Sequence, residues 1–252
     1  MTVSDINKEA TQSEVPAPIL IPLKGVRGAV ARNMSQGWEA PQVSIGIEVN
    51  MSNILEQQKK LQKECGKETR VTVTAYILRA TALALKEHPG MNAFLRDKNV
   101  ELISNINIAL AVSIEGGLAT PVIRDAEQLT LLELAAQARE LAYSCRQGTL
   151  PPKAYQSGTF TVTNLGMTGI DWFTPILNPP QVGILGISKV SEKPYVVDGQ
   201  LAIAPTTILT LVFDHRAVDG YPAAVLSEAR KSARYREQYR APDPRLLSHI
   251  SP

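Results

Sequence analysis

The sequence predicts an α+β fold, a two-layer sandwich in which helices pack on one face of a mixed β-sheet. Helical and strand patterns are mixed along the 252 residues without the regular alternation of a βαβ protein. Three strand patterns also follow one another directly, at 182–187, 195–197 and 208–213. Consecutive strands of this kind are typical of α+β rather than of parallel α/β architecture.

Helices are expected where apolar residues recur at helical spacing between capping and stop signals. Thr72 or Thr74 can cap one helix and Thr130 another, because a threonine oxygen accepts hydrogen bonds from free N–H groups in the first turn. Pro89 and Gly90 form a stop signal. The expected helices are 26–34, 52–64, 75–87, 131–146 and 221–239.

Strands are expected where apolar residues alternate or cluster between turn residues. In 43–49 the apolar residues occupy alternate positions, which predicts a strand with one buried face. The expected strands are 43–49, 93–95, 101–103, 106–114, 119–123, 158–164, 182–187, 195–197 and 208–213. With no internal repeat visible, a flexible tail at 1–20 and a single domain at 21–252 are the simplest organisation.

Composition excludes several classes of function. Charged residues make up 20% of the chain and the net charge is +2, which argues against a nucleic-acid-binding surface. Three histidines and two cysteines stand in no metal-binding spacing, so no metal is expected. No secretory signal is visible, and no apolar run approaches the roughly 18 residues that span a bilayer. A cytoplasmic protein that binds no membrane is therefore expected.

His215 is the strongest candidate for a catalytic residue. It directly follows an apolar strand pattern at 208–213 and is flanked by Asp214 and Arg216. A strand end is a rigid position from which to present an imidazole. Loop histidines near carboxylates are common, however, so composition alone leaves catalytic and structural roles equally open. Of the other histidines, His88 fits the end of a helix, where it can bond the last carbonyls.

Thr163 is a second candidate, at the end of the strand expected over 158–164. Threonines at alternate positions are also typical of an ordinary half-exposed strand. The last hydroxyl could instead donate a hydrogen bond to an oxyanion. Residue patterns alone do not separate these two interpretations, whereas the signature motifs of serine hydrolases, P-loop enzymes, dinucleotide-binding proteins and zincins are absent from the sequence.

Five segments together resemble the catalytic domain of 2-oxo acid dehydrogenase acyltransferases, whose best-known members are dihydrolipoamide acetyltransferases. The resemblance is carried by DHRAVDG (214–220), VRGAVARNM (26–34), TALALKEHPGMNA (81–93), INIALAVSIEGGLATPVIRDA (106–126) and GTFTVTNLGMTGIDWFTPILNPPQVGILGISKVSEKP (158–194). It covers about residues 21–247, in the order of the family. It implies a fold like that of chloramphenicol acetyltransferase and an acyltransferase that uses acyl-CoA as a substrate.

The resemblance implies roles for individual residues. His215 would be the general base that activates the acceptor, and Thr163 would donate to the tetrahedral oxyanion. Asp219 would hold the His215 loop, with Arg32 as its expected partner. Asn164, Gly166 and Phe173 are expected in the substrate or CoA channel, because they lie near Thr163 in the sequence.

The family also implies an assembly. Its active site lies between the subunits of a homotrimer, so His215 and Thr163 would come from different subunits. Trimers of the family assemble further, into a 24-mer for example, through a C-terminal tail that DPRLL (243–247) resembles. The appended SHISP departs from the family ending and makes such a shell less expected than the trimer.

The acceptor is the least determined part of the prediction. Residues 172–180, WFTPILNPP, resemble acetyl-transferring members, so acetyl-CoA is the expected donor. Neither a lipoyl nor a subunit-binding domain is recognisable, and no lipoyl attachment is expected in this chain. A dihydrolipoamide acetyltransferase core is therefore one hypothesis. A stand-alone O-acetyltransferase that modifies a small hydroxylated molecule, as in tetronate biosynthesis, is the second. A purely structural scaffold is the third.

Overall fold

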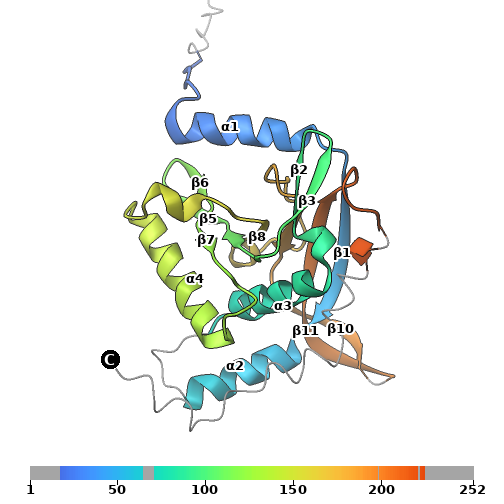
Figure 1. Ribbon diagram of the computed structural model, residues 1–252. Helices are drawn as coiled ribbons and strands as arrows, with labels where there is room; N and C mark the ends of the chain where they lie inside the picture. Colours follow the sequence, from blue (N-terminus) through green and yellow to red (C-terminus); the bar gives the residue numbers. More distant parts are fainter. Residues whose placement is uncertain (1–17, 65–70, 198, 221, 225–252) are drawn as a thin grey trace, which may run out of the picture.

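A seven-stranded mixed sheet forms the centre of the protein (Figure 1). The computed structural model describes residues 18–64, 71–197, 199–220 and 222–224. Its strands are β1 (Gln42–Asn50), β2 (Ala93–Arg96), β3 (Asn99–Leu102), β4 (Ile108–Leu110), β5 (Val112–Ile114), β6 (Gly117–Ala119), β7 (Val122–Ile123), β8 (Phe160–Asn164), β9 (Gly183–Ile187), β10 (Ser191–Val197) and β11 (Gln200–Asp214). The strand order is β1-β11-β9-β8-β4-β7, with β10 paired to β11, while β2–β3 and β5–β6 form two separate hairpins. The predicted α+β fold is confirmed.

The main hydrophobic core lies between the sheet and its helices. The α-helices are α1 (Gly25–Trp38), α2 (Ser52–Glu64), α3 (Val73–Glu87) and α4 (Leu131–Arg146), and short 3-10 turns lie at η2 (Pro89–Met91), η3 (Pro152–Tyr155) and η4 (Gly166–Thr168). Most of α3 is buried, including Tyr76 and Leu78 at 0% exposure. Burial raises the pKa of Tyr76 to about 12. Helix α3 therefore packs against the face of the sheet that carries the main core.

The helix caps follow the sequence signals. The Thr72 side chain accepts a hydrogen bond from Ala75 N–H at the start of α3. Thr130 and Glu133 form a reciprocal capping box at the start of α4. The two Thr130 hydrogen bonds lower the pKa of Glu133 below its ordinary value. These helix starts were predicted correctly to within two residues.

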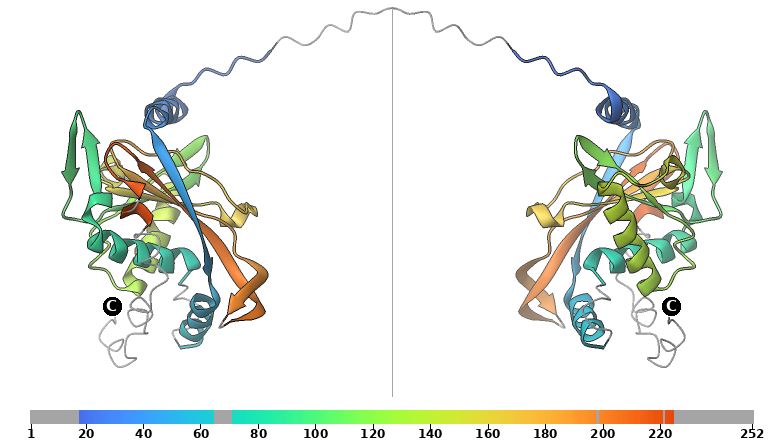
Figure 2. Two further views of the ribbon diagram at one scale, coloured as in Figure 1. Left: turned by 90° about the vertical axis from the view of Figure 1, so that its right-hand side faces the viewer. Right: turned by 90° about the vertical axis from the view of Figure 1, so that its left-hand side faces the viewer.

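The opposite face of the sheet carries a smaller apolar cluster of Ala40, Leu177, Ile184 and Val212. The cover over this face is the segment that runs from η4 to Leu177, and Figure 2 shows α3 and α4 on the other side of the sheet. A side chain at Gly37 would collide with the Leu177 carbonyl, so α1 and this segment touch through their main chains. Glycine is therefore required at that position.

Two strands that were predicted to be continuous are each divided into two in the structure. The expected strand 106–114 is divided into β4 and β5, which belong to different sheets. The chain bends between them at Ala111, whose N–H donates to Val162 O. The expected strand 119–123 is divided into β6 and β7 around Pro121, which lacks the N–H that a sheet ladder needs. Apolar runs therefore predicted strands, but not where the pairing changes partner.

Strand β11 is much longer than its apolar pattern. The expected strand covered 208–213, whereas β11 covers 15 residues. Its first half pairs with β10 in a hairpin whose faces are partly exposed, so that half lacks a continuous apolar signal. Of the helix expected over 221–239, only 222–224 are described, and the rest lies outside the described residues. The same is true of the tail at 1–17 and of residues 243–247.

Candidate active site

His215 lies in a turn directly after β11. The main-chain N–H of His215 donates to Pro41 O at 3.0 Å, which ties the turn to the start of β1. The imidazole is half-exposed, and its centroid lies 5.7 Å from that of the Phe213 ring. Its Nδ1 lies 3.9 Å from Asp219 Oδ1, which is an ion-pair distance but too long for a direct hydrogen bond. The structure thus brings His215 and Asp219 together as a loosely spaced pair.

Thr163 lies near the end of β8, on the face of the sheet that is opposite the main core. Val162, its neighbour, is buried in the main core, and adjacent strand residues point to opposite faces. Thr163 is half-buried, and its hydroxyl has no hydrogen-bond partner within the described ranges. It is directly opposite Gly186 on β9. The hydroxyl is therefore free to donate to another molecule.

A row of small residues crosses the sheet at the level of Thr163. Thr163 pairs with Gly186, Gly186 with Thr210 on β11, and Thr210 with Gly46 on β1. Residues directly opposite each other on neighbouring strands share a face. We call these four residues the threonine–glycine row. The Thr210 hydroxyl is buried without a partner among the described residues.

Aromatic and proline side chains cover the threonine–glycine row. A Cβ at Gly186 would lie 3.0 Å from Phe173 Cζ and 3.2 Å from Pro175 Cδ. A Cβ at Gly46 would lie 3.5 Å from Trp172 Nε1. Glycines at these two positions let the rings approach the sheet backbone closely. Of the three expected channel residues, Phe173 is thus the one that lies over the row.

Asn164 and Gly166 build the turn after β8. Asn164 Nδ2 donates to Thr74 Oγ1 at 2.8 Å, and Asn164 Oδ1 accepts the Gly166 N–H at 2.7 Å. A Cβ at Gly166 would lie only 2.7 Å from Ser188 O. The Asn164 amide is therefore occupied by contacts within the chain, which favours a structural role in holding Thr163. The expectation that both residues line a channel stays a prediction.

His215 and Thr163 lie far apart within one chain. Phe213 belongs to the main core, and the ring of His215, two residues later, lies tilted beside it, whereas Thr163 points to the other face. Thr163 also lies two strands from β11, and its row meets that strand at Thr210, five residues before His215. A rise of about 3.3 Å per residue and a strand spacing of about 4.8 Å put the two roughly 20 Å apart.

The predicted pairing of Arg32 with Asp219 is not formed within this chain. Among the ion pairs of the described residues, Asp219 appears only with His215. Arg32 is exposed on α1, with its Nη1 beside Gly28. Helix α1 is held over β6, where Val26 and Val30 lie against Gly117. This packing fixes the position of the Arg32 backbone independently of the His215 turn.

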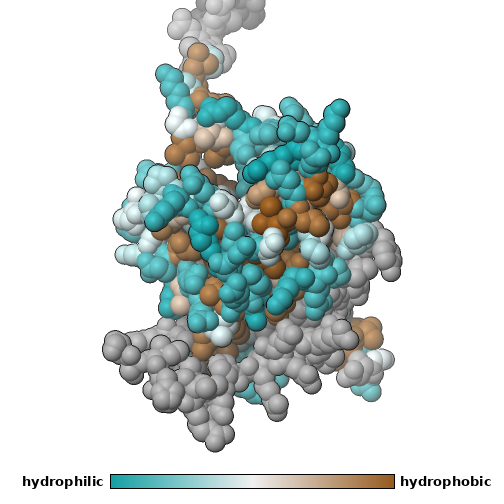
Figure 3. Space-filling view, in the orientation of Figure 1, coloured by the Kyte–Doolittle hydropathy of each residue, from teal (hydrophilic) through white to brown (hydrophobic). Residues whose placement is uncertain are grey.

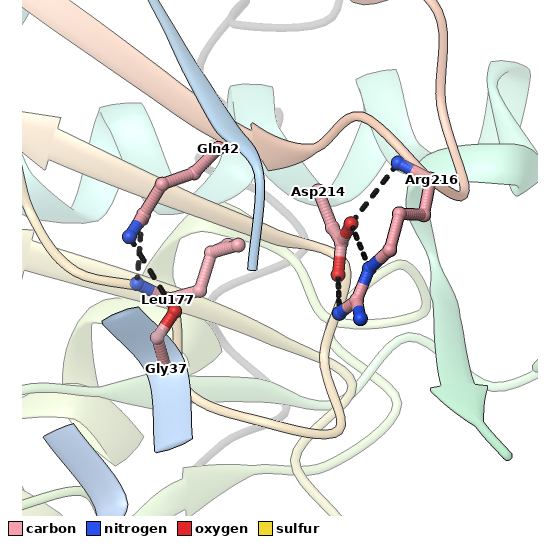
Figure 4. Close-up of polar contacts among 5 residues, drawn as sticks. All are labelled: Gly37, Gln42, Leu177, Asp214 and Arg216. Carbon is pink, nitrogen blue, oxygen red and sulfur yellow. Dashed lines mark hydrogen bonds and ion pairs between the residues drawn. The ribbon is translucent and has the colours of Figure 1, made fainter. Parts of the chain in front are cut away.

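The two residues next to His215 form an ion pair that the sequence did not predict. Asp214 is buried, with 5% of its side chain exposed, and binds the Arg216 guanidinium through both carboxylate oxygens (Figure 4). This pairing raises the pKa of Arg216 above its ordinary value. Gln42, the cross-strand neighbour of Asp214, bonds Gly37 O and the Leu177 N–H at 3.4 Å each. The sequence did carry a signal for this pair: Asp214 is a charged residue at the end of an apolar strand, and a buried charge needs a partner.

Two clefts adjoin this region. One of about 540 Å³ lies beside Asp214 and Arg216, and one of about 430 Å³ lies under α1 and is lined by Phe94 and Ile103 among others. Figure 3 shows a hollow with hydrophobic side chains between α1 and the β2–β3 hairpin.

Within the described part of the chain, no cluster of three or more ligand side chains could hold a metal ion, and no helix is long and apolar enough to cross a membrane.

A family model of the 2-oxoacid dehydrogenases acyltransferase catalytic domain matches residues 16–233. The dihydrolipoyllysine-residue acetyltransferase component of the acetoin cleaving system of Bacillus subtilis is 38% identical over 216 residues, which cover 84% of this chain and 54% of that protein. The chain thus spans about half the length of this curated relative.

Solved structures agree with this match. A probable dihydrolipoamide acetyltransferase from Listeria monocytogenes has a TM-score of 0.82 at 30% identity, over 90% of this chain and 98% of that one. The dihydrolipoamide acetyltransferase of Azotobacter vinelandii, studied for the role of a serine, a histidine and an asparagine in its mechanism, has a TM-score of 0.81 at 32% identity, over 86% of this chain and 90% of that one. Chloramphenicol acetyltransferase shares the fold, with a TM-score of 0.52 at 15% identity over 79% of this chain and 92% of that one.

Proposed function

The chain belongs to the 2-oxo acid dehydrogenase acyltransferase family through its catalytic domain, and we propose that it transfers an acetyl group between acetyl-CoA and the thiol of dihydrolipoamide. The placement of His215 carries this proposal. A half-exposed imidazole stands on a tied turn at the end of a buried strand, with Asp219 beside its Nδ1. The relatives from Bacillus, Listeria and Azotobacter are named as dihydrolipoyllysine-residue or dihydrolipoamide acetyltransferases, which favours this acceptor.

The proposed chemistry is general-base acyl transfer. His215 removes the proton from the acceptor thiol, and the sulfur forms a bond to the thioester carbonyl carbon of acetyl-CoA. The tetrahedral intermediate then expels the CoA sulfur, which takes the proton back from the imidazolium. Imidazole suits both steps because its ordinary pKa lies near neutrality. Asp219 stabilises the imidazolium charge from the Nδ1 side.

Thr163 is proposed as the oxyanion donor. Its hydroxyl has no partner in the described chain and lies on the face that Phe173 and Pro175 cover beside Gly186. A hydroxyl held on a strand can be aimed at the oxygen where negative charge develops. The phenyl ring restricts the space next to it, which suits a small acyl group such as acetyl.

The proposed active site is shared between copies of the chain. Because His215 and Thr163 lie on opposite faces of one sheet, roughly 20 Å apart by strand geometry, a second copy must supply one of them. A trimer in which each copy gives His215 to one neighbour's Thr163 satisfies every site. Of the residue types studied in the Azotobacter enzyme, the hydroxyl and the imidazole have chemical counterparts here in Thr163 and His215, while Asp219 offers a carboxylate in place of the amide. Assembly beyond the trimer stays a prediction.

The test is an assay of free CoA release from acetyl-CoA with dihydrolipoamide. His215→Ala should lower kcat by about 100- to 10,000-fold, the usual contribution of a general base, with the melting temperature unchanged. His88→Ala is the matched control, because His88 caps the end of α3. Wild-type turnover with a small hydroxylated acceptor but not with dihydrolipoamide would overturn the acceptor. Near-normal turnover of His215→Ala would overturn the base.

A further inference from the structure

The turn that carries His215 is held by an ion pair between its two neighbours, the buried Asp214 and the half-exposed Arg216. Asp214 Oδ2 accepts from Arg216 Nη2 at 2.6 Å, and Asp214 Oδ1 accepts from Arg216 Nε at 2.9 Å. Asp214 Oδ1 also accepts the Arg216 main-chain N–H at 3.0 Å. Three hydrogen bonds thus join the residues that precede and follow His215.

The hydrogen bonds of the turn are complete along the main chain. The N–H groups of residues 214–218 donate in order to Val182 O, Pro41 O, Asp214 Oδ1, Asp214 O and Asp214 O. Asp214 therefore accepts three of these five bonds, and Val182, which directly precedes β9, and Pro41 accept the other two. The His215 imidazole is the part of the turn that remains free to act.

We propose that Asp214 and Arg216 form a positioning clamp that fixes the direction of the His215 imidazole for acyl transfer. The inference rests on the proposed function, in which His215 is the base. A bidentate arginine–carboxylate pair fixes both distance and angle, which a single charge contact does not. Because Arg216 occupies both Asp214 oxygens, Asp219 is left as the carboxylate that faces the imidazole. Asp214 thus binds Arg216, whereas Asp219 faces the imidazole.

A clamp differs from a salt bridge that only stabilises the fold. Burying an ion pair contributes little net stability, because desolvation offsets the attraction. The Arg216 side chain is also 55% exposed, while its partner is 5% exposed. A misplacement of a catalytic group by about 1 Å can reduce the rate about 100-fold. The clamp should therefore affect turnover far more than substrate binding.

The experiment compares Asp214→Ala/Arg216→Ala with the wild-type assembly. Removing both partners avoids leaving a buried carboxylate without its cation, so folding is retained more readily than in either single variant. We expect kcat to fall about 100-fold while the KM for acetyl-CoA stays within about twofold. Hydrogen exchange of a peptide that contains residues 213–218 should become faster. The single variant Arg216→Lys should also have a lowered kcat, since lysine cannot make both bonds to Asp214.

Arg96→Ala is the matched control, because Arg96 lines the same cleft but pairs with the exposed Glu101. It should match the wild type in kcat and in exchange at 213–218. Faster exchange in the double variant with wild-type kcat would overturn the clamp, as would unchanged exchange. If the wild type released no CoA, the proposed function would fail. Hydrogen exchange would then still decide whether the pair orders the turn.

Discussion

The end of β11 and the end of β8 carry the two halves of the proposed chemistry, and they are built differently. At the end of β11, five consecutive N–H groups are bonded, and an ion pair of the buried Asp214 with Arg216 brackets His215. At β8, Asn164 and Gly166 hold the turn, while the Thr163 hydroxyl lies on a row of small residues beneath Phe173. The first end positions an imidazole outward, and the second leaves a narrow space beside a hydroxyl.

The comparison shows that one chain orders each of the two ends separately but does not bring them together. Each end is ordered by bonds within its own chain, so no partner is needed to position either side chain. The two ends nevertheless lie on opposite faces of the sheet. In the proposed mechanism, catalysis therefore depends on assembly, which would bring the imidazole of one copy to the hydroxyl of another.

Mixing two inactive variants gives the largest expected effect. His215→Ala and Thr163→Ala, expressed separately, should each lose activity, the latter by about 100- to 1,000-fold in kcat. Co-expressed in equal amounts, they should recover up to about a quarter of wild-type activity, because that share of shared sites receives both intact residues in a cyclic trimer. The measurement is specific activity of the purified mixed trimer. Lack of recovery in mixed trimers confirmed by mass spectrometry would place both residues in one site of one chain.

A substitution under Phe173 should sharpen the contrast between the two ends. In Gly186→Ala the new methyl would meet Phe173 Cζ at 3.0 Å and Pro175 Cδ at 3.2 Å. Overpacking of this kind costs about 1–3 kcal/mol of unfolding free energy. We also expect a lower kcat, because Phe173 must move beside Thr163. Denaturant titration and the CoA assay measure the two effects.

Gly90→Ala is the control for Gly186→Ala, since nothing lies within 4 Å of its added Cβ. It should leave activity unchanged. Equal losses in the two glycine variants would show that the space above Gly186 has no special importance.

The smallest effect is expected away from both ends, at the start of α4. Thr130→Ala removes the cap and should cost about 1 kcal/mol of stability without changing kcat. Because the Thr130 bonds lower the pKa of Glu133, their contribution is present at neutral pH and is lost as pH falls through that lowered pKa. Urea titrations at pH 7 and pH 3 measure it. Glu133→Gln should remove this part of the pH dependence, and an unchanged pH dependence would contradict the Glu133 assignment.

The sequence by itself determined the elements and the candidate residues. Helical periodicity and threonine caps located α3 and α4, because these signals are local. The segment 214–220 identified the family and made His215 the candidate base. The pairing of β4 and β5 with different strands escaped prediction, since strand partners are distant in sequence.

Only the tertiary structure decided which side chains share a face and which carboxylate serves which partner. Register places Thr163 in one row with Gly186 and Thr210, on the face opposite the main core, and a shift of one residue would reverse that result. The bidentate bond of Arg216 to Asp214, rather than to Asp219, depends on geometry at the end of β11. Composition and spacing carry no information about that choice, because both carboxylates lie within four residues of the same arginine.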